Sequence, residues 1–186
     1  MSEYRIASRY AKSLLELSEE KGVLDKVNDD MTLFSTVISE NRELLLMLRN
    51  PIVKHTKKRQ VLYQIFEGKI DKITLTIIDI ITSKNREEIL PAIAKEFHNQ
   101  YNAKNNIRSA KVTTTFPLTA ELRKRFESIV KEVFECKGVD LEEEVDESLV
   151  GGFVLTVGDR QIDDSVKSKI NGLKHEFTKN PYVKGF

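Results

Sequence analysis

The sequence predicts a mainly α-helical fold, an N-terminal bundle of six helices followed by a small α+β domain. Apolar residues recur every three to four positions through residues 1–105, which is the spacing of one helix face. After Asn105-Asn106, segments with strand periodicity alternate with helical segments. The chain has 186 residues, and 40% of them are hydrophobic, which is enough for one or two cores. We therefore expect two domains, 1–105 and 106–186.

Three helices are expected before residue 50. The apolar stripes of the first two are separated by Gly22, a residue type that suits a helix C-cap. A short apolar segment at residues 44–48 follows, and Asn50-Pro51 ends it because a residue before proline disfavours the helical conformation. The stripe residues are Ile6, Tyr10, Leu14 and Leu17 in the first helix and Leu24, Val27, Met31, Phe34 and Ile38 in the second.

Three further helices complete the predicted bundle. The fourth is expected to start near Thr56 and to end at Gly68. The fifth carries a run of isoleucines within residues 73–81. Pro91 fits only the first turn of a helix, because it lacks an N–H donor and clashes with the preceding turn. The sixth helix should therefore start at about residues 88–90.

The second domain is expected to hold three strands. Apolar and polar residues alternate in residues 110–116, 139–145 and 153–157, as they do in half-buried strands. Between the first two strands, Thr119 is expected to cap the start of a helix, and Gly138 to close it. Strands and helices interleaved in this way predict a small α+β unit.

The end of the chain carries strong turn and capping signals. Gly158-Asp159 is typical of a two-residue hairpin turn, and Asp163-Asp164-Ser165 of a helix N-cap. The double glycine Gly151-Gly152 indicates a close backbone approach or a bulge where strands meet. The tail from Lys179 is expected to be loose. The last helix has an apolar stripe made of Val166, Ile170, Leu173 and Phe177.

Composition excludes several classes of protein. The net charge of +1 lacks the strong positive field that nucleic-acid binding usually requires. No apolar run reaches the roughly 18 residues of a membrane span. Acidic residues such as Glu3 and Glu16 argue against a secretory signal or transit peptide, and we expect the mature protein to begin near Met1. Cys136 is the single cysteine, which excludes an intrachain disulfide and favours a reducing compartment.

The chain shows no constellation suited to catalysis, a cofactor or a metal. His55, His98 and His175 lie on different predicted elements, without ligand spacing. Asp159 and Asp163-Asp164 could in principle gather a divalent ion, but turn and capping duties account for them. The double glycine matches neither phosphate-loop pattern. We therefore expect a protein that is not an enzyme on its own and that has no cofactor and no metal; an unrecognised hydrolase is a remote alternative.

Two charged clusters allow more than one interpretation. The basic cluster Lys54–Arg59 could contact phosphate in a nucleic-acid-binding module, or it could form the solvated first turn of a helix. The second interpretation is favoured, because the net charge is small and no aromatic residues interleave the cluster. The acidic residues of segment 142–147 are expected at a solvated strand edge, where charge prevents unwanted pairing.

The fifth helix is apolar in more than one direction. At 100° per residue its side chains cannot all face a single core, so the helix is buried on more than one side. One interpretation places the helix at the centre of the bundle. The other assigns one side to the core and the other side, together with part of the first helix, to a groove for a partner's amphipathic helix. The residues concerned are Ile73, Leu75, Ile77, Ile78, Ile80 and Ile81.

Five short motifs occur in a characteristic order. They are Ile-Ala-Ser-Arg-Tyr-Ala-Lys-Ser-Leu at residues 6–14, Asn50-Pro51, the Lys-Asn-Arg and Leu-Pro of residues 84–91, the Val-Thr and Pro-Leu-Thr of residues 112–119, and the segment Val145–Ser165 with its Leu-Val-Gly-Gly-Phe. In order and spacing they resemble the delta subunit of F-type ATP synthases, the bacterial counterpart of the mitochondrial oligomycin-sensitivity-conferring protein. The resemblance covers the whole chain.

The resemblance implies a stator subunit with no bond chemistry of its own. The N-terminal bundle would bind the N-terminal helix of an alpha subunit in a groove between the first and fifth helices. Tyr10 and Ser13 match the family's face on the first helix, whereas Ile77, Ile80 and Ile81 are chosen on the fifth helix from periodicity. The second domain would hold the C-terminal ends of the b subunits, so that rotor torque drives ATP synthesis and proton transport instead of spinning the head.

The resemblance also implies where the protein works. It would be a peripheral protein at the cytoplasmic face of the bacterial plasma (inner) membrane, associated with that membrane through the complex and without a nucleic-acid partner. The sequence departs from the family pattern at Thr156, where a basic residue is common, and at Asp164, where glycine is common. Both departures are mild, because Asp164 can still cap a helix.

Overall fold

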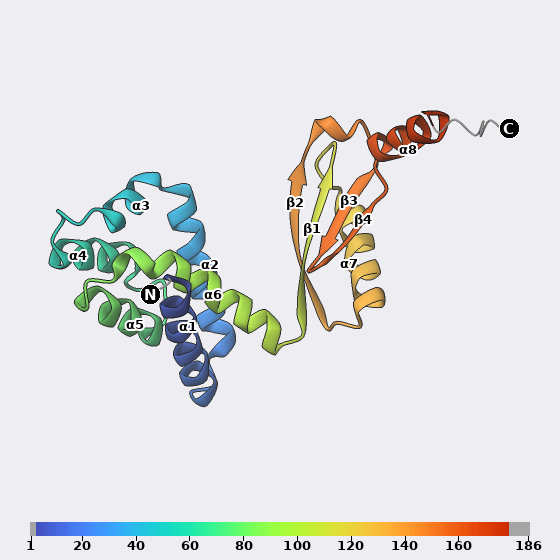
Figure 1. Ribbon diagram of the computed structural model, residues 1–186. Coiled ribbons are helices and arrows are strands. Elements are labelled where there is room, and N and C mark those ends of the chain that lie inside the picture. The colour runs from blue at the N-terminus through green and yellow to red at the C-terminus, as the bar shows by residue number, and fades with distance from the viewer. Residues whose placement is uncertain (1–2, 179–186) are drawn as a thin grey trace, which may run out of the picture. The chain divides into compact units, whose positions relative to one another are not determined.

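The computed structural model describes residues 3–178 of the chain (Figure 1). Its internal contacts divide the chain into two compact units, Met1–Tyr101 and Asn102–Phe186. The division lies close to Asn105-Asn106, where the sequence pattern changes. The expected class, a helical N-terminal region followed by a small α+β unit, is confirmed.

Six α-helices form the first unit, as the periodicity predicted. A short 3-10 helix, η1, precedes the sixth, so that Pro91 occupies the first turn of α6. The elements are α1 (Glu3–Glu20), α2 (Leu24–Glu40), α3 (Arg42–Arg49), α4 (His55–Phe66), α5 (Lys72–Ser83), η1 (Glu87–Ile89) and α6 (Leu90–Lys104).

Local capping explains where these helices end. Gly22 follows α1 with a φ of +67°, a conformation that glycine adopts without steric cost. The Val23 N–H then donates to the Ser18 carbonyl at 2.9 Å, which satisfies an acceptor at the helix end. At the start of α5, the Asp71 side chain accepts from the Ile73 N–H at 2.9 Å.

A single apolar core lies inside the described part of the first unit. The rings of Phe34 on α2 and Phe66 on α4 pack against each other, with centroids 5.1 Å apart. Helix α5 contributes only part of its surface, through Ile78 and Ile81. The largest fully buried side chains of this core are Phe34, Phe66, Phe97, Leu14, Leu48, Leu62, Ile81, Ile93 and Val27.

The second unit contains a sheet with the strand order β2-β1-β3-β4. β1 and β2 are parallel and are joined through α7, whereas β3 pairs antiparallel with both β1 and β4. Figure 1 shows α7 against one face of this sheet. The elements are β1 (Ile107–Thr114), α7 (Ala120–Phe134), β2 (Gly138–Val145), η2 (Glu147–Leu149), β3 (Phe153–Val157), β4 (Arg160–Asp163) and α8 (Val166–Thr178).

Three details of the second unit differ from the sequence analysis. The strand β4 was not predicted, because its four residues are all exposed and show no apolar alternation. Phe116 lies beyond the end of β1 and is exposed. Gly138 begins β2 and does not close α7, which ends at Phe134 and has Glu135 as its C-cap residue, in the left-handed conformation with a φ of +49°. The expected cap of α7 is confirmed, since the Thr119 side chain accepts from the Leu122 N–H.

A small core joins the sheet to α7. Val112 on β1 pairs with Leu155 on β3, and both are buried. Phe126 on α7 contacts Phe153 edge to face, with ring centroids 5.0 Å apart. Strand β2, which carries the acidic residues, lies at an edge of the sheet, as its charge predicted.

The double glycine marks a close backbone approach. Gly152 has a φ of +78°, and a Cβ atom built on it would lie 2.3 Å from the Asp164 carbonyl oxygen. No side chain fits there without displacing backbone. The Gly151 carbonyl accepts from the Val166 N–H at 3.0 Å, which holds the first residue of α8 beside the glycines.

Helix α8 begins at a well-formed cap. The Ser165 Oγ accepts from the Ser168 N–H at 3.2 Å, and the Asp163 carboxylate accepts from the Ser165 N–H at 2.9 Å. The cap is therefore Ser165 and not Asp164, which pairs with Lys169 at 2.7 Å. The expected loose tail from Lys179 lies outside the described residues.

Candidate partner-binding surfaces

The predicted site residues on α1 line a shallow hollow of about 290 Å³. Ile6, Tyr10 and Ser13 recur at helical spacing and therefore share one face of α1. Ile6 and Tyr10 are half-buried, and Ser13 is exposed. The hollow is completed by Arg9 and by Arg86, which lies beyond the end of α5.

Helix α5 divides its isoleucines between the inside and the outside of the bundle. Ile81 is 0% exposed and belongs to the core, together with Ile78. Ile80 is 41% exposed, and Ile73 and Ile77 on the same face are half-buried. One side of α5 therefore belongs to the core, and the other side is exposed, as a partner site would require. Ile81 is not available to a partner in this structure, whereas Ile77 and Ile80 are.

A long-range contact ties the hollow on α1 to the end of α5. The Arg86 Nη1 donates to the Tyr10 hydroxyl at 3.4 Å, and the Arg86 N–H donates to the Ile81 carbonyl at 3.1 Å. Arg86 follows Asn85, whose φ of +53° turns the chain at this point. The sequence motifs include Arg86, but sequence reasoning did not place it at the site.

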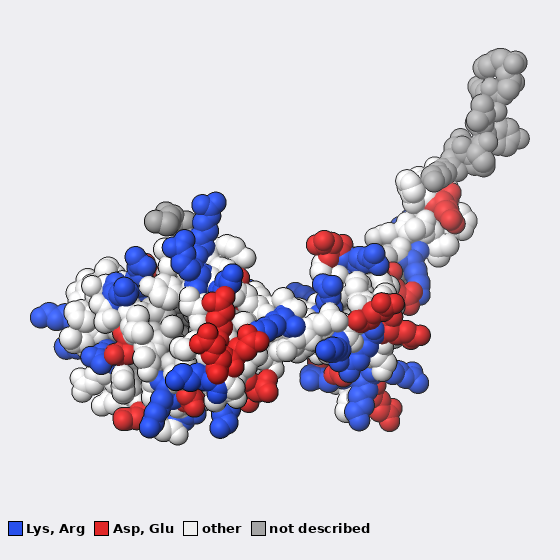
Figure 2. Space-filling model, turned by 90° about the horizontal axis from the view of Figure 1, so that it is seen from below, with Lys and Arg blue, Asp and Glu red and all other residues white. Residues whose placement is uncertain are grey.

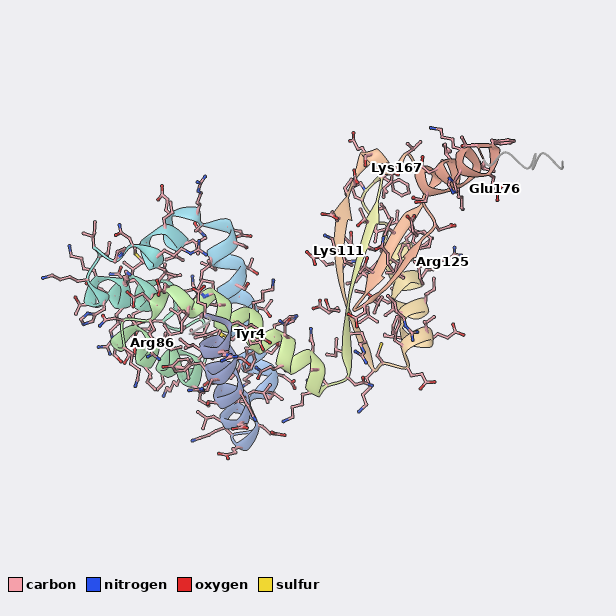
Figure 3. The ribbon with its side chains drawn as sticks, viewed as in Figure 1. Tyr4, Arg86, Lys111, Arg125, Lys167 and Glu176 are labelled. Atoms are coloured by element: carbon pink, nitrogen blue, oxygen red, sulfur yellow. The ribbon has the colours of Figure 1, made fainter. Side chains whose placement is uncertain are left out.

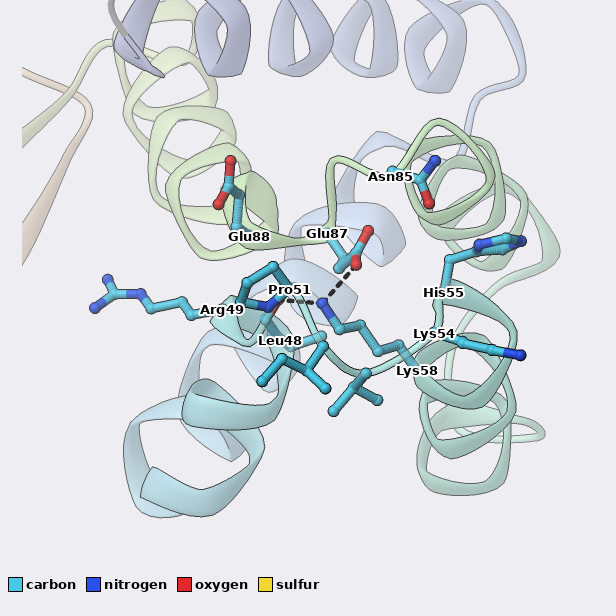
Figure 4. Close-up of a pocket in the computed structure, with 11 residues that line it drawn as sticks. Leu48, Arg49, Pro51, Lys54, His55, Lys58, Asn85, Glu87 and Glu88 are labelled. Carbon is cyan, nitrogen blue, oxygen red and sulfur yellow. Dashed lines mark hydrogen bonds and ion pairs between the residues drawn. The ribbon is translucent and has the colours of Figure 1, made fainter.

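The basic cluster forms the exposed first turn of α4 that the sequence favoured, with the exception of Lys58. Lys58 is 2% exposed, and its Nζ donates to the Leu48 carbonyl at 2.8 Å and to the Glu87 Oε1 at 2.6 Å (Figure 4). Arg59 pairs with Asp79 on α5. Two of the cations therefore hold the bundle together, because they connect α4 with α3, η1 and α5.

A hollow of about 420 Å³ lies beside the Lys58–Glu87 ion pair. Lys54 and His55 line it from the start of α4, and Glu88 lines it from η1 (Figure 4). The Glu87 Oε2 is buried and has no hydrogen-bond partner in the described part of the chain. The other oxygen of this carboxylate pairs with Lys58, so a structural ion pair forms the polar side of the hollow.

The first unit also has an apolar hollow that sequence reasoning missed. It has a volume of about 640 Å³ and lies between α2, α3 and α4. Each helix contributes side chains that look like ordinary core or surface positions in the sequence, so no local pattern marks the hollow. Its lining is Val37, Asn41, Glu43, Leu44, Met47, Val61 and Ile65.

The second unit presents apolar surface on two elements. A hollow of about 380 Å³ lies between the end of α7 and strands β3 and β4, lined by residues such as Val133 and Ile162. The stripe on α8 exists as predicted, but none of the α8 side chains, which the structure describes in full, is buried. Phe177 is 88% exposed. The core of its own unit therefore does not cover this stripe.

The clear pKa shifts among the described residues arise mainly from local hydrogen bonds. Figure 2 shows basic and acidic side chains intermingled on the visible face of each unit. Hydrogen bonds from Ser148 lower the pKa of Asp146, and hydrogen bonds from Ser168 and Ser165 lower that of Asp163. The hydrogen bond from Tyr101 to Asp25 raises the pKa of the tyrosine. Within residues 3–178, no three His, Cys, Asp or Glu side chains are grouped so as to hold a metal ion.

A helical bundle and a small α+β unit, each with exposed apolar side chains among the described residues, suit a protein that binds other proteins. The sequence profile of the family described as ATP synthase delta (OSCP) subunit matches residues 6–177. The chain belongs to this family. It is a structural, non-catalytic component of the F-type ATP synthase, a stator protein that serves ATP synthesis.

Similar proteins support this assignment over the full length of the chain. An ATP synthase subunit delta from Cytophaga hutchinsonii is 43% identical over 178 residues, covering 96% of this chain and 97% of that protein. One from Amoebophilus asiaticus is 38% identical, covering 95% and 96%. A chain in the structure of the Toxoplasma gondii mitochondrial ATP synthase hexamer shares the fold, with a TM-score of 0.72 at 23% identity, covering 92% of this chain and 96% of that chain.

The described residues contain no helix that is both long and apolar enough to cross a membrane.

Proposed function

We propose that the first unit binds the N-terminal helix of an alpha subunit and the second unit binds the C-terminal ends of the b subunits. The protein then ties the catalytic head to the membrane-anchored stalk at the cytoplasmic face of the bacterial plasma membrane, so that rotor torque drives ATP synthesis. The observation that carries the proposal is that α1 and α5 each keep apolar side chains that the core does not fully bury. They are Ile6 and Tyr10 on α1, beside Ser13, and Ile77 and Ile80 on α5.

Apolar contact is large enough to provide most of the affinity. Fully burying four large apolar side chains, here three isoleucines and a tyrosine ring, contributes roughly 6–12 kcal/mol before the cost of association. Since Ile6 and Ile77 are already half-buried, the upper value is a limit. Nanomolar binding needs about 12 kcal/mol, and an exposed ion pair adds only about 0–1. The apolar surface is therefore the main contact, and additional polar contacts are needed to reach tight binding.

The α8 stripe supports the second half of the proposal. Val166, Ile170, Leu173 and Phe177 are all at least one-third exposed, although their spacing places them on one helix face. An amphipathic helix with an uncovered apolar face is suited to packing against another helix. The ends of the b subunits are the partner we propose for this face.

The contact with the alpha partner is tested with a synthetic peptide of that protein's N-terminal segment, titrated into the full chain by calorimetry. We expect tight binding, weakened at least about tenfold by Ile80→Asp, because a carboxylate would be desolvated against the partner's apolar face. Leu46→Asp is the matched control, since Leu46 is an exposed aliphatic residue on α3. It should change the affinity less than about twofold. Equal affinities for both variants, or no binding to the unmodified chain, would count against the proposal.

A further inference from the structure

Two arginines from distant parts of the chain converge on the hollow of α1. Arg9 belongs to α1 itself, and Arg86 follows α5 (Arg86 is labelled in Figure 3). Both line the hollow of about 290 Å³, together with Ile6, Tyr10 and Ser13. The Tyr10 hydroxyl accepts from Arg86 at 3.4 Å, which holds this guanidinium at the hollow.

Neither guanidinium has an acidic partner in the described part of the chain. Among residues 3–178, no carboxylate lies within ion-pair distance of Arg9 or Arg86. On α1, the positions three and four residues from Arg9 are held by Arg5, Ile6, Lys12 and Ser13. Since these are the positions that meet on a helix surface, α1 cannot neutralise Arg9 by itself. The nearest acid after Arg86 is Glu87, which is buried against Lys58.

The other polar groups of the hollow do not supply an anion. The Ser13 hydroxyl already donates to the Arg9 carbonyl at 3.0 Å. The Tyr10 oxygen accepts from Arg86, so its own proton can serve a further acceptor. The lining therefore offers two guanidinium groups and a phenol proton beside apolar carbon from Ile6. The complementary group is an acceptor with negative charge, and a planar carboxylate matches a guanidinium in shape.

We propose that this hollow binds a carboxylate side chain, Glu or Asp, of the partner helix that covers the apolar surface of α1 and α5. Arg86 and Arg9 would clamp the carboxylate, while Ile6 and Tyr10 contact the apolar residues on the same helix. This proposal rests on the proposed function, because the occupant is the N-terminal helix of the alpha partner. The two arginines would then determine which partner helix binds and in which register it lies along α1 and α5. A charged pair at the border of an apolar contact disfavours registers in which the carboxylate misses the arginines.

The test is a double-mutant cycle between the full chain and the N-terminal peptide of the alpha partner. On the protein side, Arg86→Gln removes the positive charge at the hollow. Arg49→Gln is the matched control: Arg49 is exposed on α3, so this substitution removes the same charge elsewhere in the bundle. On the peptide side, each Glu or Asp is changed in turn to its amide. We expect Arg86→Gln to weaken binding about tenfold and Arg49→Gln less than twofold.

The cycle distinguishes the clamp from the proposed function. One amide substitution in the peptide should weaken binding to the unmodified chain about tenfold but binding to the Arg86→Gln chain less than twofold, which identifies the paired carboxylate. If the peptide binds the unmodified chain tightly and Arg86→Gln behaves as Arg49→Gln does, the clamp is overturned and the proposed function stands. If the peptide does not bind, both fail. Should Arg86→Gln lower the thermal stability, Arg9→Gln on the exposed face of α1 provides the same cycle.

Discussion

The buried ion pair between Lys58 and Glu87 should contribute strongly to the stability of the bundle. Both side chains are nearly buried, with 3% and 8% exposed, and their charged atoms are 2.6 Å apart. Replacing Lys58 by methionine keeps an unbranched apolar side chain and removes the charged ammonium group. The Glu87 carboxylate would then be buried without a counter-charge, and the Leu48 carbonyl would lose its donor.

The expected loss of stability depends on the Glu87 carboxylate, which Lys58→Met leaves without its counter-charge. Breaking a buried pair by removing one partner costs about 3–5 kcal/mol, because the remaining charge is desolvated and unpaired. For a unit of this size, about 1 kcal/mol shifts the melting temperature by roughly 4–8 °C. We therefore expect Lys58→Met to lower the melting temperature by at least about 12 °C. Lys57→Met, at an exposed position on the same helix, should change stability by no more than about 0.5 kcal/mol.

The assay is urea and thermal unfolding of the full chain, followed by far-ultraviolet circular dichroism, which reports mainly the helices of the bundle. The double substitution Lys58→Met with Glu87→Met should recover most of the loss, because replacing both charges by apolar groups of similar volume is often neutral or stabilising. A Lys58→Met chain that unfolds within about 1 kcal/mol of the unmodified one would refute the buried pair. A double variant no better than the single one would show that the unpaired carboxylate is not the cause.

Three other predictions concern backbone, pH and the outer surfaces. Gly152→Ala should destabilise the second unit by more than about 1 kcal/mol in urea unfolding. Gly152 has a positive φ, and the added methyl group would collide with the Asp164 carbonyl, so an unchanged midpoint would contradict the prediction. The lowered pKa of Asp163 means that its contribution to the start of α8 is present above the ordinary value of 3.8 and is lost as the pH falls through the folded pKa. The protection factors of the α8 amides, which correct for the intrinsic exchange rate at each pH, should therefore fall in acid, and Asp163→Asn should remove this pH dependence. Leu173→Asp should leave the melting curve unchanged yet abolish binding to a peptide from the C-terminal end of a b subunit. Ile81→Asp should instead unfold the bundle, and a Leu173→Asp chain less stable than the Ile81→Asp chain would refute the burial pattern.

The sequence by itself determined the eight α-helices and three of the four strands of the described residues. Helical periodicity requires six helices in the first unit, since each must bury one apolar stripe. Gly22 and Thr119 act where the sequence placed them, because caps depend on groups only a few residues away. The motif order led to the correct family. The double glycine also predicted a close approach that the geometry of Gly152 confirms.

Only the tertiary structure decided which faces are covered. Periodicity shows that α5 is apolar on two sides, but the packing of neighbouring helices decides that Ile81 is inside and Ile80 outside. Lys58 appeared to be a solvated lysine, because the carboxylate that neutralises it is 29 residues away. Arg86 joins the hollow on α1 through a contact with Tyr10 across 76 residues. Local sequence determines backbone conformation, whereas burial and charge pairing depend on residues that only folding brings together.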